Sequence, residues 1–106
     1  MVAEDTLTIL RRYKARLLEE GLPIQGLVLY GSHARGEARP DSDIDVLAIF
    51  DDSVSPNELH RLWTRIDCLT VGIDTRIETW PVTARRFATD EGSPLLEIVR
   101  QEGVPV

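Results

Sequence analysis

The sequence is poor in cysteine, in basic side chains and in long apolar runs. Cys68 is the single cysteine among 106 residues, which excludes an internal disulfide and fits a reducing compartment. The 12 Lys and Arg against 18 Asp and Glu give a net charge of −6. This balance disfavours broad binding to DNA or RNA, because such binding relies on basic side chains that neutralise phosphates. No apolar run approaches the roughly 20 residues of a membrane span, and the N-terminus lacks the pattern of a signal peptide. We therefore expect a cytoplasmic protein without membrane contact.

What the sequence does contain is enough apolar material for one packed core. Hydrophobic residues make up 42% of the chain, so we expect a single domain over residues 1–106. Leucines at helical spacing predict a helix over residues 5–20, which Gly21 and Pro23 end. Capping sequences predict further helices that open at Ser55, Thr83 and Ser93.

Three segments have the composition of strands, namely residues 25–32, 42–50 and 72–80. In the second segment, alternation places Asp43 and Asp45 on one face and Ile44 on the other. The resulting order α-β-β-α-β-α-α predicts an α/β domain with a small mixed sheet flanked by helices. The apolar end of the chain, residues 103–106, is expected to add to a sheet edge or an interface.

A polar stretch, residues 31–45, separates the first two predicted strands. It opens with Gly31-Ser32, where a residue without Cβ lets a ligand approach the backbone and a hydroxyl can donate to a phosphate oxygen. It ends at Asp43 and Asp45, whose spacing on a strand points both carboxylates the same way and favours a divalent cation between them. A lone Asp-x-Asp is more typical of a turn, but its occurrence together with Gly-Ser between two apolar strands favours a site. The chemistry predicted is Mg²⁺-dependent phosphoryl or nucleotidyl transfer.

This pattern of Gly31-Ser32 followed by Asp43-Ile44-Asp45 resembles the DNA polymerase β-like nucleotidyltransferase superfamily. Within it, the block "GSHARGEARPDSDIDVLAIF" is most similar to the minimal nucleotidyltransferases of bacteria and archaea. The resemblance implies that superfamily's fold, two Mg²⁺ ions, and transfer of a nucleotidyl group from a nucleoside triphosphate to an acceptor. It also implies that Gly31 and Ser32 hold the triphosphate and that the two aspartates bind the metal ions.

The superfamily also uses a third carboxylate on a neighbouring strand, as a metal ligand and as the base toward the acceptor hydroxyl. Asp74 and Glu78 lie on one face of the predicted third strand and are both candidates. Counting back from the helix that opens at Thr83, as proteins of this superfamily usually run, the resemblance favours Glu78, whereas aspartate is the commoner residue type for this role. Four residues of strand span roughly 13 Å, so both cannot reach the same ions directly. Glu78 is preferred, and Asp74 remains the alternative.

Other side chains near the motif have two interpretations each. Arg35 neutralises phosphate charge, or it is solvated or paired with Asp41. Ser42 orients the aspartate that follows or touches the nucleotide, or it is a turn serine. Tyr30 is expected to pack in the core with its hydroxyl satisfied, and Trp80 lines the nucleotide pocket or lies in the core or an interface.

The function predicted is transfer of AMP from ATP to a hydroxyl, with loss of pyrophosphate. No acceptor-binding domain is visible in 106 residues, so a second subunit or a separate protein is expected to present the acceptor. The resemblance implies a HEPN-family partner, because many minimal nucleotidyltransferases are encoded with one and act on it as antitoxins. The alternative is a non-catalytic module that binds nucleotide or neutralises a partner by contact. The non-catalytic alternative is favoured if neither Asp74 nor Glu78 lies near Asp43 and Asp45.

Overall fold

In a computed structural model that describes residues 2–106, four strands form one mixed sheet in the order β3-β2-β1-β4. β1 (Ile24–Tyr30) and β2 (Ile44–Phe50) are antiparallel, and β3 (Ile77–Thr83) runs parallel to β2. The short β4 (Val104–Pro105) pairs antiparallel with β1, so the apolar C-terminus does extend the sheet. The expected α/β fold with a small mixed sheet is confirmed.

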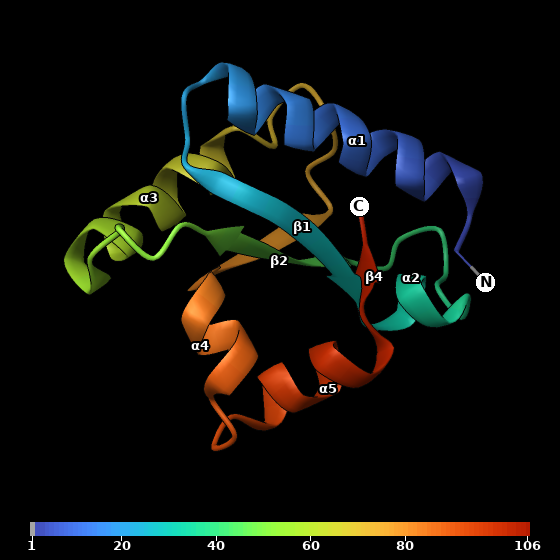
Figure 1. Cartoon of the computed structure of the whole chain (residues 1–106). Coiled ribbons are helices and arrows are strands. Elements are labelled where there is room, and N and C mark those ends of the chain that lie inside the picture. Colours follow the sequence, from blue (N-terminus) through green and yellow to red (C-terminus); the bar gives the residue numbers. More distant parts are fainter. Residues whose placement is uncertain (1) are drawn as a thin grey trace.

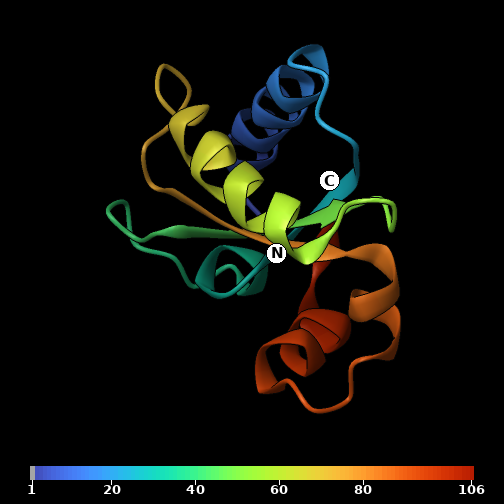
Figure 2. The same cartoon turned by 90° about the vertical axis from the view of Figure 1, so that its left-hand side faces the viewer.

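Helices cover both faces of this sheet. α1 (Glu4–Glu19) and α3 (Pro56–Cys68) lie on one side, and α4 (Ala84–Thr89) and α5 (Pro94–Glu102) on the other (Figures 1 and 2). The three predicted caps form as expected, because the side chains of Ser55, Thr83 and Ser93 each accept a hydrogen bond from a backbone N–H in the first helical turn.

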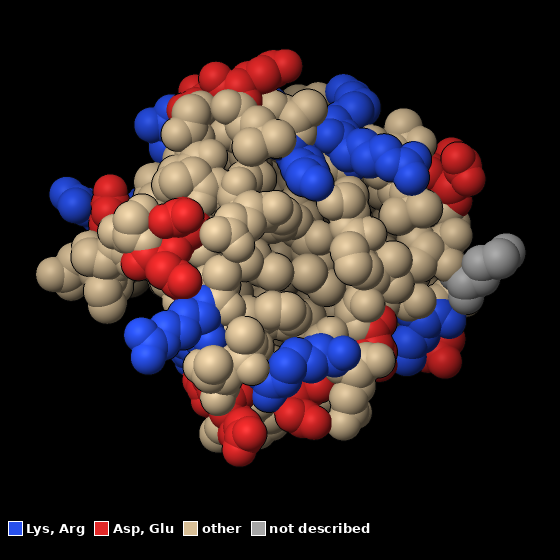
Figure 3. Space-filling model, viewed as in Figure 1, with Lys and Arg blue, Asp and Glu red and all other residues tan. Residues whose placement is uncertain are grey.

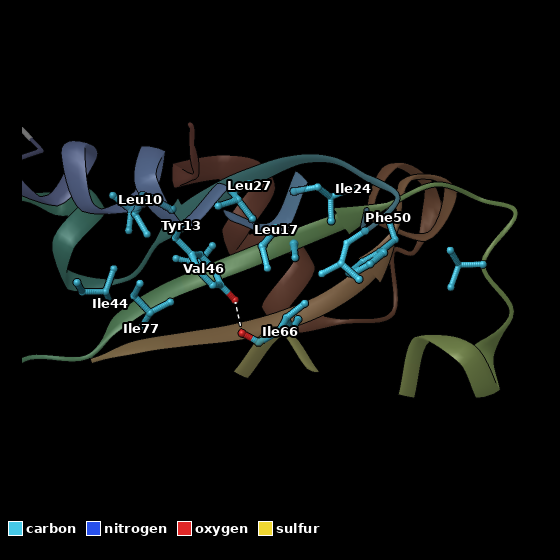
Figure 4. Close-up of a cluster of buried hydrophobic side chains, with 14 residues drawn as sticks. Leu10, Tyr13, Leu17, Ile24, Leu27, Ile44, Val46, Phe50, Ile66 and Ile77 are labelled. Atoms are coloured by element: carbon cyan, nitrogen blue, oxygen red, sulfur yellow. Dashed lines mark hydrogen bonds between the residues drawn. The ribbon is translucent and has the colours of Figure 1, made fainter. Parts of the chain in front are cut away.

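The alternation of β2 divides its side chains between two apolar clusters. The larger cluster packs one face of β2, including Val46, against α1 and α3 (Figure 4). Tyr13 lies fully buried in it, and its hydroxyl donates to the carbonyl of Ile66 at 2.8 Å and lies 2.9 Å from Thr79 Oγ1. The smaller cluster packs Leu47 on the other face against α4 and α5. The sheet is therefore held from both sides, which fixes the strand ends that carry the polar residues.

The third strand differs from the prediction in its position. It runs over Ile77–Thr83 and not over residues 72–80. Residues 70–74 form a turn instead, in which the N–H groups of Ile73 and Asp74 donate to the carbonyl of Thr70. The alternation that suggested a strand there belongs to this turn, so Asp74 does not share a strand face with Glu78.

Basic and acidic side chains are mixed on the face of the protein that Figure 3 shows. Lys and Arg lie next to Asp and Glu around its rim, and the centre of the face, over β1, is uncharged. This face therefore offers no broad basic surface for a nucleic-acid backbone. Within residues 2–106, no helix has both the length and the apolar character needed to cross a membrane.

Candidate active site

Three neighbouring strands bring polar side chains together at one end of the sheet. β1 ends at Tyr30, which is the register partner of Asp45 on β2, and Asp45 is in turn the partner of Glu78 on β3. Register partners on adjacent strands project from the same face of a sheet, so these three side chains form a row. Asp43 precedes the row by two residues of chain and is exposed. Segments distant in the sequence thus meet at one site.

Gly31 allows the backbone to pass directly against one of these carboxylates. Its φ is +77°, a conformation that residues with a side chain rarely adopt. A Cβ at this position would lie 2.6 Å from Asp45 Oδ2. Immediately afterwards the chain forms α2 (Ser32–Arg35), a short helix at a place where a strand end and loop were predicted. The N–H groups of Ala34 and Arg35 both donate to the carbonyl of Gly31, which closes the first turn of α2.

Negative charge is concentrated in this row of side chains. Burial raises the pKa of Asp45, and the nearby charge of Asp43 raises it further. The charge of Asp43 is also the largest cause of the raised pKa of Glu78, followed by burial and the charge of Asp45. Burial, and then the charges of Asp45 and Glu78, raise the pKa of Tyr30 to about 12. Tyr30 is therefore protonated at neutral pH, and the carboxylates repel one another.

The chemistry of this donor set fits a divalent cation. Asp43, Asp45 and Glu78 supply carboxylate oxygens, the ligands that Mg²⁺ prefers, and their mutual repulsion is what a cation would relieve. Among residues 2–106, no three or more His, Cys, Asp or Glu side chains are already arranged in a metal-binding geometry. The strand register places the carboxylates as neighbours, and side-chain rotation is needed to direct them at a shared ion.

Asp74, the alternative candidate for the third carboxylate, lies outside this row. Asp74 binds the guanidinium of Arg76, with 2.8 Å between Oδ2 and Nη2, and accepts from the Arg76 backbone N–H at 2.9 Å. Arg76 Nη1 also donates to the carbonyl of Pro40 at 2.7 Å. Asp74 thus holds an arginine that connects the turn before β3 to the polar stretch. The structure does not bring it into the row with Asp45.

Replacement of Asp74 by Asn is expected to reduce stability without abolishing function. The hydrogen bonds from Arg76 lower the pKa of Asp74, so its ionised form stabilises the fold at pH values above the unfolded value of about 3.9. We expect Asp74→Asn to lower the free energy of unfolding by about 1 kcal/mol at pH 7. The difference from the wild type should shrink as the pH falls below about 4, where Asp74 becomes protonated. Urea unfolding at several pH values measures this, and a difference that grows at low pH would contradict it.

Two predicted phosphate ligands have partners within the chain. Arg35 binds Glu37 at 3.1 Å and Glu102 on α5 at 3.0 Å, so Asp41 is not its partner. Its guanidinium would have to leave these exposed pairs to reach a phosphate. Ser42 Oγ accepts a hydrogen bond from the backbone N–H of Arg39 at 2.9 Å, the contact of a turn serine.

Two further side chains, His33 and Tyr30, lie beside the carboxylates or the polar stretch. His33 is buried, with Nε2 3.2 Å from the carbonyl of Ser42 and Nδ1 3.3 Å from Thr6 Oγ1. Because a carbonyl only accepts, Nε2 donates to Ser42, and Nδ1 lies within hydrogen-bond distance of the Thr6 hydroxyl. His33 thereby holds the two ends of the polar stretch together. Tyr30 was expected in the core. It is partly buried and packs against the smaller apolar cluster, and the strand register also places it beside Asp45.

Comparison with known proteins identifies the fold. Residues 10–102 match the nucleotidyltransferase domain family. The chain belongs to this family. Over 49 residues it is 39% identical to a Methanocaldococcus jannaschii protein named as a protein adenylyltransferase, a match that covers 46% of this chain and 48% of that protein. The chain thus spans about half the length of this curated relative.

Solved structures place the nucleotidyltransferase domain among small relatives. A minimal nucleotidyltransferase is 28% identical with a TM-score of 0.56, and the match covers 95% of each chain. A nucleotidyltransferase from Sulfolobus solfataricus has a TM-score of 0.63 at 17% identity, covering 96% of this chain and 82% of that one. A toxin–antitoxin structure with AMP-PNP has a TM-score of 0.55 at 22% identity, covering 89% and 69%. The last two support the fold alone. The family match over residues 10–102 confirms that the chain is a nucleotidyltransferase, as the motif led us to expect.

Proposed function

We propose that this nucleotidyltransferase transfers AMP from ATP to a hydroxyl of an acceptor protein. The observation that carries the proposal is the register of three strands, which places Asp45 and Glu78 side by side next to Gly31. The name of the M. jannaschii relative supports a protein acceptor and an adenylyl group. In this reaction the acceptor oxygen attacks the α-phosphorus in line, and pyrophosphate leaves.

We assign the site residues to metal binding, triphosphate binding and proton transfer. Asp43, Asp45 and Glu78 would hold Mg²⁺, which when bound neutralises charge on the phosphate oxygens. The backbone after Gly31, with the hydroxyl of Ser32, holds the triphosphate. Glu78 accepts the proton of the attacking hydroxyl. Asp74 is not assigned to this role, because Arg76 occupies its carboxylate.

The position of Glu78 favours an enzyme over a module that only binds. A non-catalytic domain has no need for a third carboxylate beside the Asp-x-Asp pair, since mutual repulsion there costs stability. The charge of Asp43 is the first cause of the raised pKa of Glu78, and this supports the placement of the two carboxylates in one site.

The acceptor in this proposal is a separate protein, and the HEPN-family partner implied by the motif is the first candidate. The toxin–antitoxin structure that shares this fold supports a partner of the toxin class and a nucleoside triphosphate as substrate. Purification of the tagged chain from its native host, followed by mass spectrometry, tests the assignment. Recovery of the chain without any HEPN-family protein would count against it.

Glu78→Gln is expected to separate nucleotide binding from transfer. Loss of a general base costs about a hundredfold to ten-thousandfold in rate, whereas the two aspartates still hold the nucleotide. We therefore expect labelling of acceptor proteins by ATP carrying a radioactive α-phosphate to fall about a hundredfold or more. The affinity for AMP-PNP with Mg²⁺, measured by titration calorimetry, should change less than about tenfold. Asp74→Asn is the control for a nearby carboxylate, and equal losses in both variants would contradict the assignment of Glu78.

A further inference from the structure

The strand that carries Glu78 lies at an edge of the sheet. Within residues 2–106, β2 is the sole strand neighbour of β3. An edge strand presents backbone N–H and C=O groups on its outer side, where an extended peptide can add as a further strand. Pro81 lacks an N–H, which limits such pairing to the first part of β3, from Ile77 to Trp80. This is the part next to the carboxylates.

A pair of aromatic side chains lies on the same edge, with Trp80 exposed and Trp63 partly buried. Trp80 exposes 48% of its surface, although it is one of the largest apolar side chains of the protein. Its ring centroid lies 5.1 Å from that of Trp63 on α3, with the ring planes inclined by 54°. Large aromatic side chains beside a groove are typical of the residues that dominate binding energy at protein interfaces. The pair therefore offers an apolar anchor point next to the unpaired strand edge.

An open groove of about 400 Å³ connects the aromatic pair to Glu78. Asp67 on α3 and Glu78 are its charged lining residues, and no Lys or Arg lines it. Both carboxylates are exposed. The groove therefore carries two negative charges and no positive charge, and it is complementary to a segment that carries Lys or Arg.

We propose that this groove docks an extended, basic segment of the acceptor protein. The segment adds to the edge of β3, packs an apolar side chain on Trp80 and places a basic side chain beside Asp67. The hydroxyl of this acceptor segment that receives AMP then lies next to Glu78. The inference rests on the proposed function for the identity of the occupant as acceptor, whereas the groove, the free edge and the charge are properties of the structure itself.

Selection of peptides from a displayed random library on the purified chain tests the proposal. We expect the selected peptides to carry an excess of Lys and Arg. The chain has 2 tryptophans, and both lie at the site, so a change in intrinsic fluorescence on peptide addition reports binding there. Trp80→Ala should weaken the binding about tenfold or more, and Trp80→Phe should restore most of it. Ile98→Ala on α5 is the matched control, because Ile98 is 46% exposed and lies outside the groove.

A charge exchange gives a second, independent measurement. Asp67→Lys, at an exposed helical position, should weaken the basic peptides about tenfold and favour acidic ones. Selected peptides that are not basic, or that bind Trp80→Ala as tightly as the wild type, would overturn the proposal. So would a dimer that depends on Trp80 in sedimentation experiments, because a second copy would then occupy the edge.

The nucleotide measurement distinguishes this proposal from the proposed function. Trp80→Ala should leave the affinity for AMP-PNP with Mg²⁺ unchanged, and a loss of that affinity would assign the aromatic pair to the base and overturn the docking site. Asp45→Asn should retain peptide binding. Peptide binding by a wild-type chain that fails to bind AMP-PNP would support the groove while contradicting the transfer reaction.

Discussion

Asp45→Asn is expected to abolish Mg²⁺-dependent binding of AMP-PNP and transfer of AMP. The carboxylate lies at the centre of the row, between Tyr30 and Glu78, and directly against Gly31. An amide cannot replace a carboxylate as a ligand for Mg²⁺ without loss of charge, and a metal ion contributes several kcal/mol to the transition state. This corresponds to a fall of about a thousandfold in transfer, and to about a hundredfold in affinity when Mg²⁺ is present.

The same substitution should leave the fold intact. Burial and the charge of Asp43 raise the pKa of Asp45, so the folded state holds a proton there more tightly than the unfolded chain does. For such a group, ionisation at neutral pH opposes folding, and stability increases as the pH falls through the folded pKa. Removal of the charge should therefore leave the melting temperature at pH 7 unchanged or raise it.

Asp51→Asn is the matched control for this experiment. Asp51 follows the opposite end of the same strand and is exposed, so its replacement makes the same change in net charge away from the site. Titration calorimetry with AMP-PNP, with and without Mg²⁺, together with thermal unfolding, gives both quantities. An Asp45→Asn chain that binds AMP-PNP as the wild type does, and in a Mg²⁺-dependent manner, would contradict the metal assignment.

The core and the placement of Asp45 at one end of the second strand could be predicted from local patterns. Alternation in residues 42–50 assigned Val46 and Leu47 to opposite faces, and the two apolar clusters of the structure confirm it. Asp45 lies on β2 as predicted, whereas Asp43 lies just before the strand, which begins at Ile44 and not at residue 42. Such patterns work because the period of a strand is a local property of the backbone.

Features that depend on contacts between distant segments could not be predicted in this way. The start of β3 was misplaced because Ile73 and Thr75 alternate like a strand, while the hydrogen bonds to Thr70 make a turn. The orientation of Tyr30 toward Asp45 follows from the pairing of β1 with β2, which no single segment specifies. The binding of Arg76 by Asp74 likewise became visible only in three dimensions, and it favours Glu78 as the third carboxylate.

Gly31→Ala is expected to impair function much more than its effect on stability suggests. The positive φ of Gly31 costs about 1–2 kcal/mol for any residue with a Cβ. The added methyl group would also lie 2.6 Å from Asp45 Oδ2, a contact that the carboxylate can relieve by rotating away. Rotation preserves the fold but turns the proposed metal ligand away from the site. We therefore expect transfer to fall about a hundredfold, the effect of a small misplacement of a catalytic group.

Two other glycines separate the contributions to this effect. Gly21 has the same φ of +77°, but a Cβ there would meet nothing within 4 Å, so Gly21→Ala measures the backbone strain alone. Gly26 on β1 has neither feature, and Gly26→Ala should leave stability and function near those of the wild type. Urea unfolding should show similar losses of about 1–2 kcal/mol for Gly21→Ala and Gly31→Ala, with AMP-PNP binding impaired in Gly31→Ala alone. Impaired binding in Gly21→Ala as well would mean that strain, and not the contact with Asp45, explains the requirement for glycine at position 31.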